Sequence, residues 1–278
     1  MGTLGRTWEL YKQSFSVLGA DVEILVFPVI SAIAAILLAA GFFVPFFVDG
    51  TFLSMKNGTA GWEPYAVLFV WYYFNSFVVI FFNSAIVACA NIRLSGGDPT
   101  VADGLRVAFS RVVKIACWAF VSSTVGVILS SLRNRRNKLL SLVTSGLAVA
   151  WALITYLIIP VIIVENVNVS GAMMRSSELF RKTWGEEVAG SFGFGLLSVL
   201  LCLPGFLLAY LIFPYDAGAA IIVGLVYILL LATVSSAVKG VFTVALYRYA
   251  TDGVAPYGFT AESLNPNPRS RRGSYLDF

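Results

Sequence analysis

The residues best placed to do chemistry form a polar stripe in the last long apolar run of the chain. Lys239 lies there with Ser236, Thr243 and Tyr247, at spacings of three, four and four residues. Such spacings put the four side chains on one face of a helix. If the run crosses a membrane, an ionisable residue inside it indicates a functional site. Alternatively, the crossing ends at Val238, and Lys239 is an anchor whose amine reaches the lipid headgroups.

Other polar residues within apolar runs are weaker candidates for a site. Asn75 and Asn83 lie eight residues apart in one run, and asparagines in such positions commonly supply hydrogen bonds between helices. Glu165 follows another run at the carboxyl end of a predicted helix, where the helix dipole disfavours an acid. A pairing of Glu165 with Arg175 or with Lys239 would offset this cost.

Composition and motifs exclude several kinds of chemistry. The sequence contains no His, which rules out a His-ligated metal, a His general base and a Ser-His or Cys-His pair. Cys89, Cys117 and Cys202 lie far apart in apolar runs and form no CxxC motif. No Walker A motif, no GxSxG motif and no pair of carboxylates inside an apolar run is present. We therefore expect no metal, no cofactor and no enzymatic activity.

The composition is that of an integral membrane protein. Of 278 residues, 58% are hydrophobic and 12% are charged, and the mean hydropathy is +0.83. Soluble proteins carry about 25% charged residues. The net charge of +4 is modest, and the basic residues lie at the ends of apolar runs, where membrane topology explains them. We expect membrane lipids, and no nucleic acid, as partners.

The apolar runs predict an all-α, polytopic membrane protein with a single membrane domain over residues 1–250. We expect six transmembrane helices in three hairpins, and each hairpin follows an amphipathic helix that lies at the membrane interface. The expected spans are residues 24–48, 66–92, 115–132, 139–164, 188–213 and 217–249. The expected interfacial helices are residues 3–20, 101–113 and 171–185. The last span is longer than the roughly 20 residues that a bilayer needs, so it tilts or projects beyond the bilayer.

The first and third interfacial helices share more than amphipathicity. Residues 9–15 (ELYKQSF) align with residues 178–184 (ELFRKTW), with identical or similar residues at each position. The middle helix is less regular, and Thr100 is expected to cap its amino end. The pattern indicates three repeats of a surface helix and a hairpin, with chance convergence of amphipathic helices as the alternative. The residues expected to anchor these helices in the interface are Trp8, Tyr11, Phe15, Phe180, Arg181, Lys182 and Trp184.

The distribution of basic residues predicts the orientation. Six spans put both termini on one side, which then holds 13 of the 19 Lys and Arg residues. The positive-inside rule makes that side cytoplasmic, so both termini and all three surface helices face the cytoplasm, in the cell (inner or plasma) membrane. Residues 133–138, with three Arg and one Lys, conflict with this rule, and a re-entrant pair of segments is the alternative there. Residues 251–278 are Pro-rich and polar and are predicted to be a disordered tail.

The chain resembles a family of prokaryotic six-span membrane proteins known only as a domain of unknown function. The resemblance is carried by GRTWELYKQSFSVL with Glu23, Phe27 and Pro28, and further on by PVIIVE, SSELFRKTWGEE and GSFGFG. The layout of surface helix and hairpin is also similar to the membrane domain attached to some glycerophosphodiester phosphodiesterases. Neither resemblance implies a catalytic residue, and the basic turn and the Pro-rich tail depart from the pattern.

Two functions are compatible with these features. The first is a non-enzymatic multi-pass membrane protein that binds a protein partner, anionic lipid or a second copy of itself through its cytoplasmic surface helices. The second is a transporter or channel for a small solute or lipid, with a polar path between the hairpins that Lys239 faces. An intramembrane enzyme ranks third, because no acid–base pair is visible.

Overall fold

The described part of the chain folds into helices and connecting turns. In the computed structural model it comprises residues 3–59, 61–133, 138–183 and 193–264, with side chains described for residues 8–59, 61–133, 141–181 and 201–264. The apolar helices are α2 (Val26–Val48), which continues the short helix η1 (Val22–Leu25), α4 (Glu63–Leu94), α6 (Val112–Arg133), α7 (Lys138–Ile154), α8 (Ile158–Glu165), α10 (Gly193–Ile212) and α11 (Ala217–Asp252).

Several of these helices could lie in a bilayer. Among the described residues, five helical segments are long and apolar enough to cross a membrane: residues 22–48, 63–94, 112–133, 141–165 and 217–252. The segment 141–165 combines most of α7 with α8, and the described part of α10 adds a shorter apolar stretch. A helix satisfies its backbone hydrogen bonds internally, as a membrane requires. The chain therefore has the framework of a membrane-embedded helical protein.

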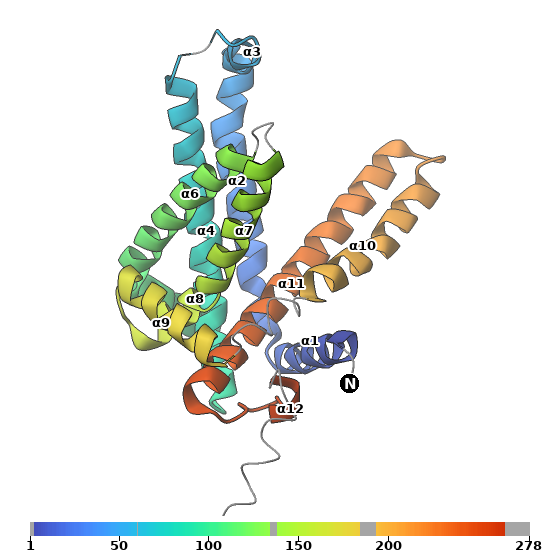
Figure 1. The fold of residues 1–278 in the computed structure, drawn as a ribbon. Helices are drawn as coiled ribbons and strands as arrows, with labels where there is room; N and C mark the ends of the chain where they lie inside the picture. Colours follow the sequence, from blue (N-terminus) through green and yellow to red (C-terminus); the bar gives the residue numbers. More distant parts are fainter. Residues whose placement is uncertain (1–2, 60, 134–137, 184–192, 265–278) are drawn as a thin grey trace, which may run out of the picture.

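The central helix of the fold is α4, which packs against α2, α6, α8 and α11. Figure 1 shows α2, α4, α6 and α7 as one group, whereas the hairpin of α10 and α11 is inclined away from that group. The two groups meet where the carboxyl-terminal half of α11 crosses α4.

Three further helices precede the pairs of apolar segments: α1 (Thr3–Ala20), α5 (Val101–Ser110) and α9 (Val169–Thr183). Figure 1 shows α1 and α9 at the end of the molecule that also holds α12 (Ala261–Leu264), opposite to α3 (Thr51–Lys56). We call these ends the α1 end and the α3 end. The predicted cap of α5 is confirmed, because Thr100 Oγ1 accepts the Asp103 N–H at 3.2 Å and the Asp103 carboxylate accepts the Thr100 N–H at 3.1 Å.

The buried core is concentrated at the α1 end. All buried residues of α4 lie between Phe81 and Leu94, and those of α11, Ala220 apart, lie between Ala237 and Ala250. The other halves of both helices expose large apolar side chains over several turns, as a lipid environment allows. A bilayer needs about 20 residues of helix, whereas α4 has 32 and α11 has 36. The additional turns of both helices form the core.

A break divides the span predicted at residues 139–164 into α7 and α8. Pro160 lacks an N–H and crowds the carbonyl four residues earlier, which disfavours helix at Tyr156. Ser176 of α9 satisfies the freed backbone, since its hydroxyl donates to the Ile154 carbonyl at 2.6 Å and accepts the Leu157 N–H at 3.2 Å. The break is therefore stabilised by a side chain from another helix.

The segment after α11 differs from the predicted disordered tail as far as residue 264. Gly253 ends α11 in the left-handed conformation, and the chain then turns back onto α1. Ser263 Oγ donates to Gln13 Oε1 at 2.8 Å, and Phe259 and Leu264 are buried. This hydrogen bond and the burial of the two apolar side chains order a segment whose composition alone indicates disorder. Residues 265–278 lie outside the described part of the chain.

Candidate functional site

A groove of about 190 Å³ lies between α2, α4 and α11. Its lining is mostly apolar, with side chains such as Val79, Phe82 and Leu229. Four polar side chains interrupt this lining: Ser31 of α2, Asn83 of α4, and Thr233 and Ser236 of α11. The groove thus lies between the first and the third of the predicted hairpins.

Gly240 determines where the groove ends towards the α1 end. A Cβ at this position would overlap Cγ2 of Ile86 and would lie 3.7 Å from Oδ1 of Asn83. Without a side chain there, the α11 backbone approaches α4 closely. Beyond this contact α11 leans away from α2 and α4 towards the α3 end (Figure 1), so the space beside Asn83 opens.

Most of the polar side chains in the groove have no protein partner. The Thr233 hydroxyl donates to the Leu229 carbonyl of its own helix at 2.8 Å. Within the described residues, the side chains of Ser31, Asn83 and Ser236 make no hydrogen bond. All three side chains are half-buried, so their polar groups are open to a ligand in the groove. A ligand with hydrogen-bond donors and acceptors could pair with them.

The residues of the predicted polar stripe on α11 lie in different environments. Ser236 faces the groove together with Asn83, as described above. Lys239 is exposed and does not line the groove. Thr243 is buried and donates its hydroxyl to the Lys239 carbonyl at 2.7 Å. Asn75 is half-buried on α4 and lies outside the groove lining.

Glu165 belongs to a separate polar cluster at the end of α8. Its Oε1 accepts Nε–H of Arg175 at 3.2 Å and the hydroxyl of Tyr247 at 3.0 Å. Arg175 also donates from Nη1 to Glu178 at 3.2 Å. The sequence suggested Arg175 or Lys239 as the partner of Glu165, and in the structure the partner is Arg175. The hydrogen bond to Glu165, followed by that to Glu178, raises the pKa of Arg175 above its ordinary value.

Basic side chains cap the carboxyl ends of α1, α4 and α8 at the α1 end. Arg93 donates to the Ala20 carbonyl at 3.4 Å and pairs with Asp21. Arg248 donates to the Leu94 carbonyl at 3.3 Å. The Lys114 amine bonds the backbone and side-chain carbonyls of Asn166. A cation at a helix carboxyl end is favourable for the helix dipole, so these residues join neighbouring elements of the fold.

The predicted interfacial anchors on α1 are divided between two faces. Trp8 and Phe15 are 55% and 51% exposed, and Lys12 is exposed beside them. Tyr11 is half-buried, and its ring stacks on Trp8 with centroids 6.3 Å apart.

The predicted anchors on α9 include one that the structure places elsewhere. Phe180 is only 7% exposed, because the apolar face of α9 packs on α7, α8 and α11. The Phe180 ring therefore packs inside the protein and does not lie on the exposed face of α9. Arg181 is exposed, and Lys182 lies in the last turn of α9. Trp184 lies outside the described residues.

Two residues of the groove were not among the predicted site residues. Ser31 is the one polar side chain in the otherwise apolar sequence of α2, which is a signal that the sequence does contain. Thr233 lies three residues before Ser236, at a spacing that extends the predicted stripe along the same helix. The convergence of both with Asn83 depends on the packing of three helices.

The protein belongs to the class of helical membrane proteins. It has long apolar helices, a core at one end of them and further helices at the surface beside that core. The chain belongs to the family of unknown function DUF6159, whose pattern matches residues 63–257, from the start of α4 to the segment after α11. This agrees with the expected membership of an uncharacterised family. Comparisons with curated proteins and with solved structures found no match. The similarity to the membrane domain of glycerophosphodiester phosphodiesterases stays a resemblance of layout.

Proposed function

We propose that the protein is a non-enzymatic membrane protein with six spans in three hairpins, bound to the cytoplasmic leaflet of the cell membrane through α1. In this proposal α10 supplies the sixth span, and α1, α5 and α9 are the interfacial helices that precede the hairpins. The observation that carries the proposal is the outward face of α1. Membrane lipid, in particular anionic lipid, is the proposed partner.

The two faces of α1 have different surroundings. Leu10, Ser14, Val17 and Leu18 are buried, on the side where α1 packs against α11 and α12. The opposite face presents Trp8, Lys12 and Phe15, which follow one another at spacings of four and three residues.

Such a stripe of aromatic rings around a lysine suits the headgroup region of a bilayer. Aromatic rings are enriched at membrane interfaces, and a lysine amine is attracted to anionic lipid. The protein already holds α1 by its other face, so the stripe is free to contact lipid.

The arrangement of charges supports the cytoplasmic orientation. With the α1 end in the cytoplasm and six spans, 13 of the 19 Lys and Arg residues lie on that side. Arg93, Lys114, Arg175 and Arg248 take part in the polar contacts at the α1 end. The positive-inside rule favours this orientation over the reverse.

The proposal is tested by measuring the depth of α1 with spin labels. Cys89, Cys117 and Cys202 are replaced by Ala, and nitroxide labels are attached at Trp8→Cys or Phe15→Cys in nanodiscs that contain anionic lipid. We expect both labels to be more accessible to oxygen than to a water-soluble nickel chelate. A label at Asn57→Cys, in the exposed turn after α3, gives the reference for water. If labels at positions 8 and 15 behave like this reference, the proposal fails.

Transport of a small solute or lipid is the alternative, and the groove between α2, α4 and α11 is the observation that favours it. Against it, the exposed Lys239 does not line the groove, whereas the sequence-based hypothesis placed it on the path. A solute flux in proteoliposomes that Lys239→Ala abolishes would favour transport.

A further inference from the structure

We propose that the groove between α2, α4 and α11 binds a neutral lipid that carries a hydroxyl group and that enters sideways from the cytoplasmic leaflet. In this complex the headgroup lies between Asn83 and Ser236, and one acyl chain runs along α11 towards the α3 end. The choice of leaflet rests on the orientation proposed above, whereas the binding site itself does not depend on α1, which contributes no residue to the groove lining.

The position of the groove along the helices fits the level of lipid headgroups. The buried residues of α11, Ala220 apart, begin at Ala237, and those of α4 begin close to Asn83. The turns on the α3 side of the groove expose apolar side chains, as lipid requires. The groove therefore lies where the apolar surface meets the polar and buried end of the protein. Glycerol and ester groups of lipids occupy this level of a bilayer.

The hydrogen-bonding groups in the groove need a partner that the protein does not supply. Asn83 offers an amide donor and an acceptor, and Ser31 and Ser236 offer hydroxyl groups. Within the described residues none of these three side chains has a hydrogen bond. At the level of the glycerol and ester groups, a hydroxyl or ester group of a lipid can supply that partner.

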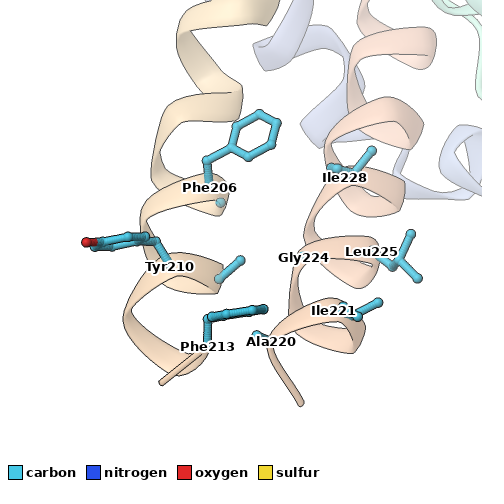
Figure 2. A pocket seen from close by; sticks show the side chains of 10 residues that line it. Phe206, Tyr210, Phe213, Ala220, Ile221, Gly224, Leu225 and Ile228 are labelled. Atoms are coloured by element: carbon cyan, nitrogen blue, oxygen red, sulfur yellow. The ribbon is translucent and has the colours of Figure 1, made fainter. Parts of the chain in front are cut away.

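A second groove provides the path for an acyl chain. Figure 2 shows it between α10 and α11, with apolar side chains including Phe206, Phe213 and Ile228 around it. Its volume is about 410 Å³, and Leu225 is part of its lining. No charged residue lines it.

The linings of the two grooves follow one another along α11. Leu225 of the second groove and Leu229, Ala232 and Ser236 of the first follow one another at spacings of four, three and four residues. These spacings form one stripe on the helix. From Ser236 to Leu225 the stripe is about 16 Å long at 1.5 Å per residue. This length is close to half the roughly 30 Å hydrocarbon core of a bilayer, which is the depth of one leaflet.

The charge of the lining determines the charge of the headgroup. None of the residues that line the first groove is ionisable. Lys239, one turn from Ser236, is exposed and does not join the lining. An anionic or cationic headgroup would enter this groove without a counter-charge, which is unfavourable away from water. A neutral headgroup with hydroxyl or ester oxygens fits the groove better.

The experiment is photo-crosslinking in phosphatidylcholine nanodiscs that contain diacylglycerol with a diazirine in one acyl chain. We expect cross-linked peptides from residues 201–236 and loss of labelling when unlabelled diacylglycerol is added. Asn83→Leu keeps the size of the side chain but removes its hydrogen bonds, and should lower labelling about fivefold to tenfold. Asn75→Leu is the matched control on the same helix and should stay within about twofold of the unmodified protein.

Several results would overturn the inference. Equal labelling of the Asn83→Leu and Asn75→Leu proteins would mean that Asn83 does not bind the lipid. Competition by phosphatidylglycerol would indicate an anionic ligand, and competition by free glycerol would indicate a water-soluble one. If Asn83→Leu fails to fold, the double variant Ser31→Ala and Ser236→Ala replaces it, with an expected decrease of about threefold to fivefold. Unchanged labelling of that variant contradicts the proposal equally.

Discussion

Arg175 and Glu165 form an ion pair across the turn between α8 and α9, with 3.2 Å between Nε and Oε1. Tyr247 of α11 donates its hydroxyl to the same Glu165 oxygen. One carboxylate therefore joins α8 to a surface helix and to the last long helix. An acid at the carboxyl end of α8 is unfavourable for the helix dipole, and these two donors compensate for that position.

Replacement of Arg175 by Met should lower the stability of the protein modestly. The Arg175 side chain is 38% exposed, and pairs with this much solvent contact contribute about 1 kcal/mol or less. Thermal unfolding in detergent measures the effect. Arg106→Met is the control, since Arg106 is exposed and its nearest acid lies 3.8 Å away. The reversed pair Glu165→Arg and Arg175→Glu should be more stable than either single reversal, and equal loss in all three would contradict a direct pairing.

Gly104 of α5 should tolerate no side chain. A Cβ there would lie 2.6 Å from Cys89 Sγ, 2.7 Å from Phe27 Cζ and 3.0 Å from the Ala85 carbonyl. Gly104→Ala should therefore lower the free energy of unfolding by about 1–3 kcal/mol through overpacking.

The matched control for Gly104 is Gly41→Ala, where a Cβ would meet nothing within 4 Å. Because Ala favours helix over Gly, this variant should be unchanged or up to about 1 kcal/mol more stable. Thermal unfolding of both variants in the same detergent tests the prediction. A Gly104→Ala protein as stable as the control would mean that α5 is not packed against α4 and α2 in this way.

Ser176→Ala should destabilise the break between α7 and α8. The Ser176 side chain is fully buried, and its loss would leave the Leu157 N–H and the Ile154 carbonyl without a partner. The expected cost is about 1–3 kcal/mol, measured by chemical or thermal unfolding. Ser177→Ala should have little effect, because the Ser177 hydroxyl bonds only to its own helix, at the Met174 carbonyl. Similar effects of both variants would show that Ser176 does not cap the break.

The capping box of α5 should make stability depend on pH in the acid range. The hydrogen bonds from the Thr100 hydroxyl and the Thr100 N–H lower the pKa of Asp103. A carboxylate with a lowered pKa in the folded state stabilises the protein above its unfolded pKa of about 3.9, and this contribution is lost as the pH falls through the folded pKa. The melting temperature of Asp103→Asn should therefore lie below that of the unmodified protein at neutral pH, and the gap should close below about pH 4. A gap that is constant with pH would contradict this.

Periodicity and composition predict the features of the helices that depend on residues close together in the sequence. The Thr100 cap needs only Asp103, three residues later, and the sequence was enough to predict it. The break before α8 also depends on Ser176, which lies 22 residues after Ile154. The segment before residue 264 is ordered through contacts such as Ser263 with Gln13, 250 residues apart. No local pattern in the sequence indicates such contacts between distant residues.

The candidate site shows the same limit. Asn75 and Asn83 are both polar residues in an apolar helix, and the sequence gives no reason to prefer either one as a site residue. The rotation of α4 and the inclination of α11 decide that Asn83 lies in the groove and Asn75 outside it. Phe180 likewise belongs to an amphipathic pattern that fits lipid and protein equally well, and packing against α7 and α8 assigns it to the protein.

The central claim is that α1, α5 and α9 all lie on the cytoplasmic face of the membrane, and cysteine labelling tests it most directly. In a protein without its native cysteines, single cysteines replace Lys12, Arg106, Arg181 or Asn57, and a membrane-impermeant maleimide is applied to intact cells and to inverted vesicles. The account predicts that positions 12, 106 and 181 react only in inverted vesicles and position 57 only in intact cells. Reaction of positions 12 and 181 from opposite sides would contradict it.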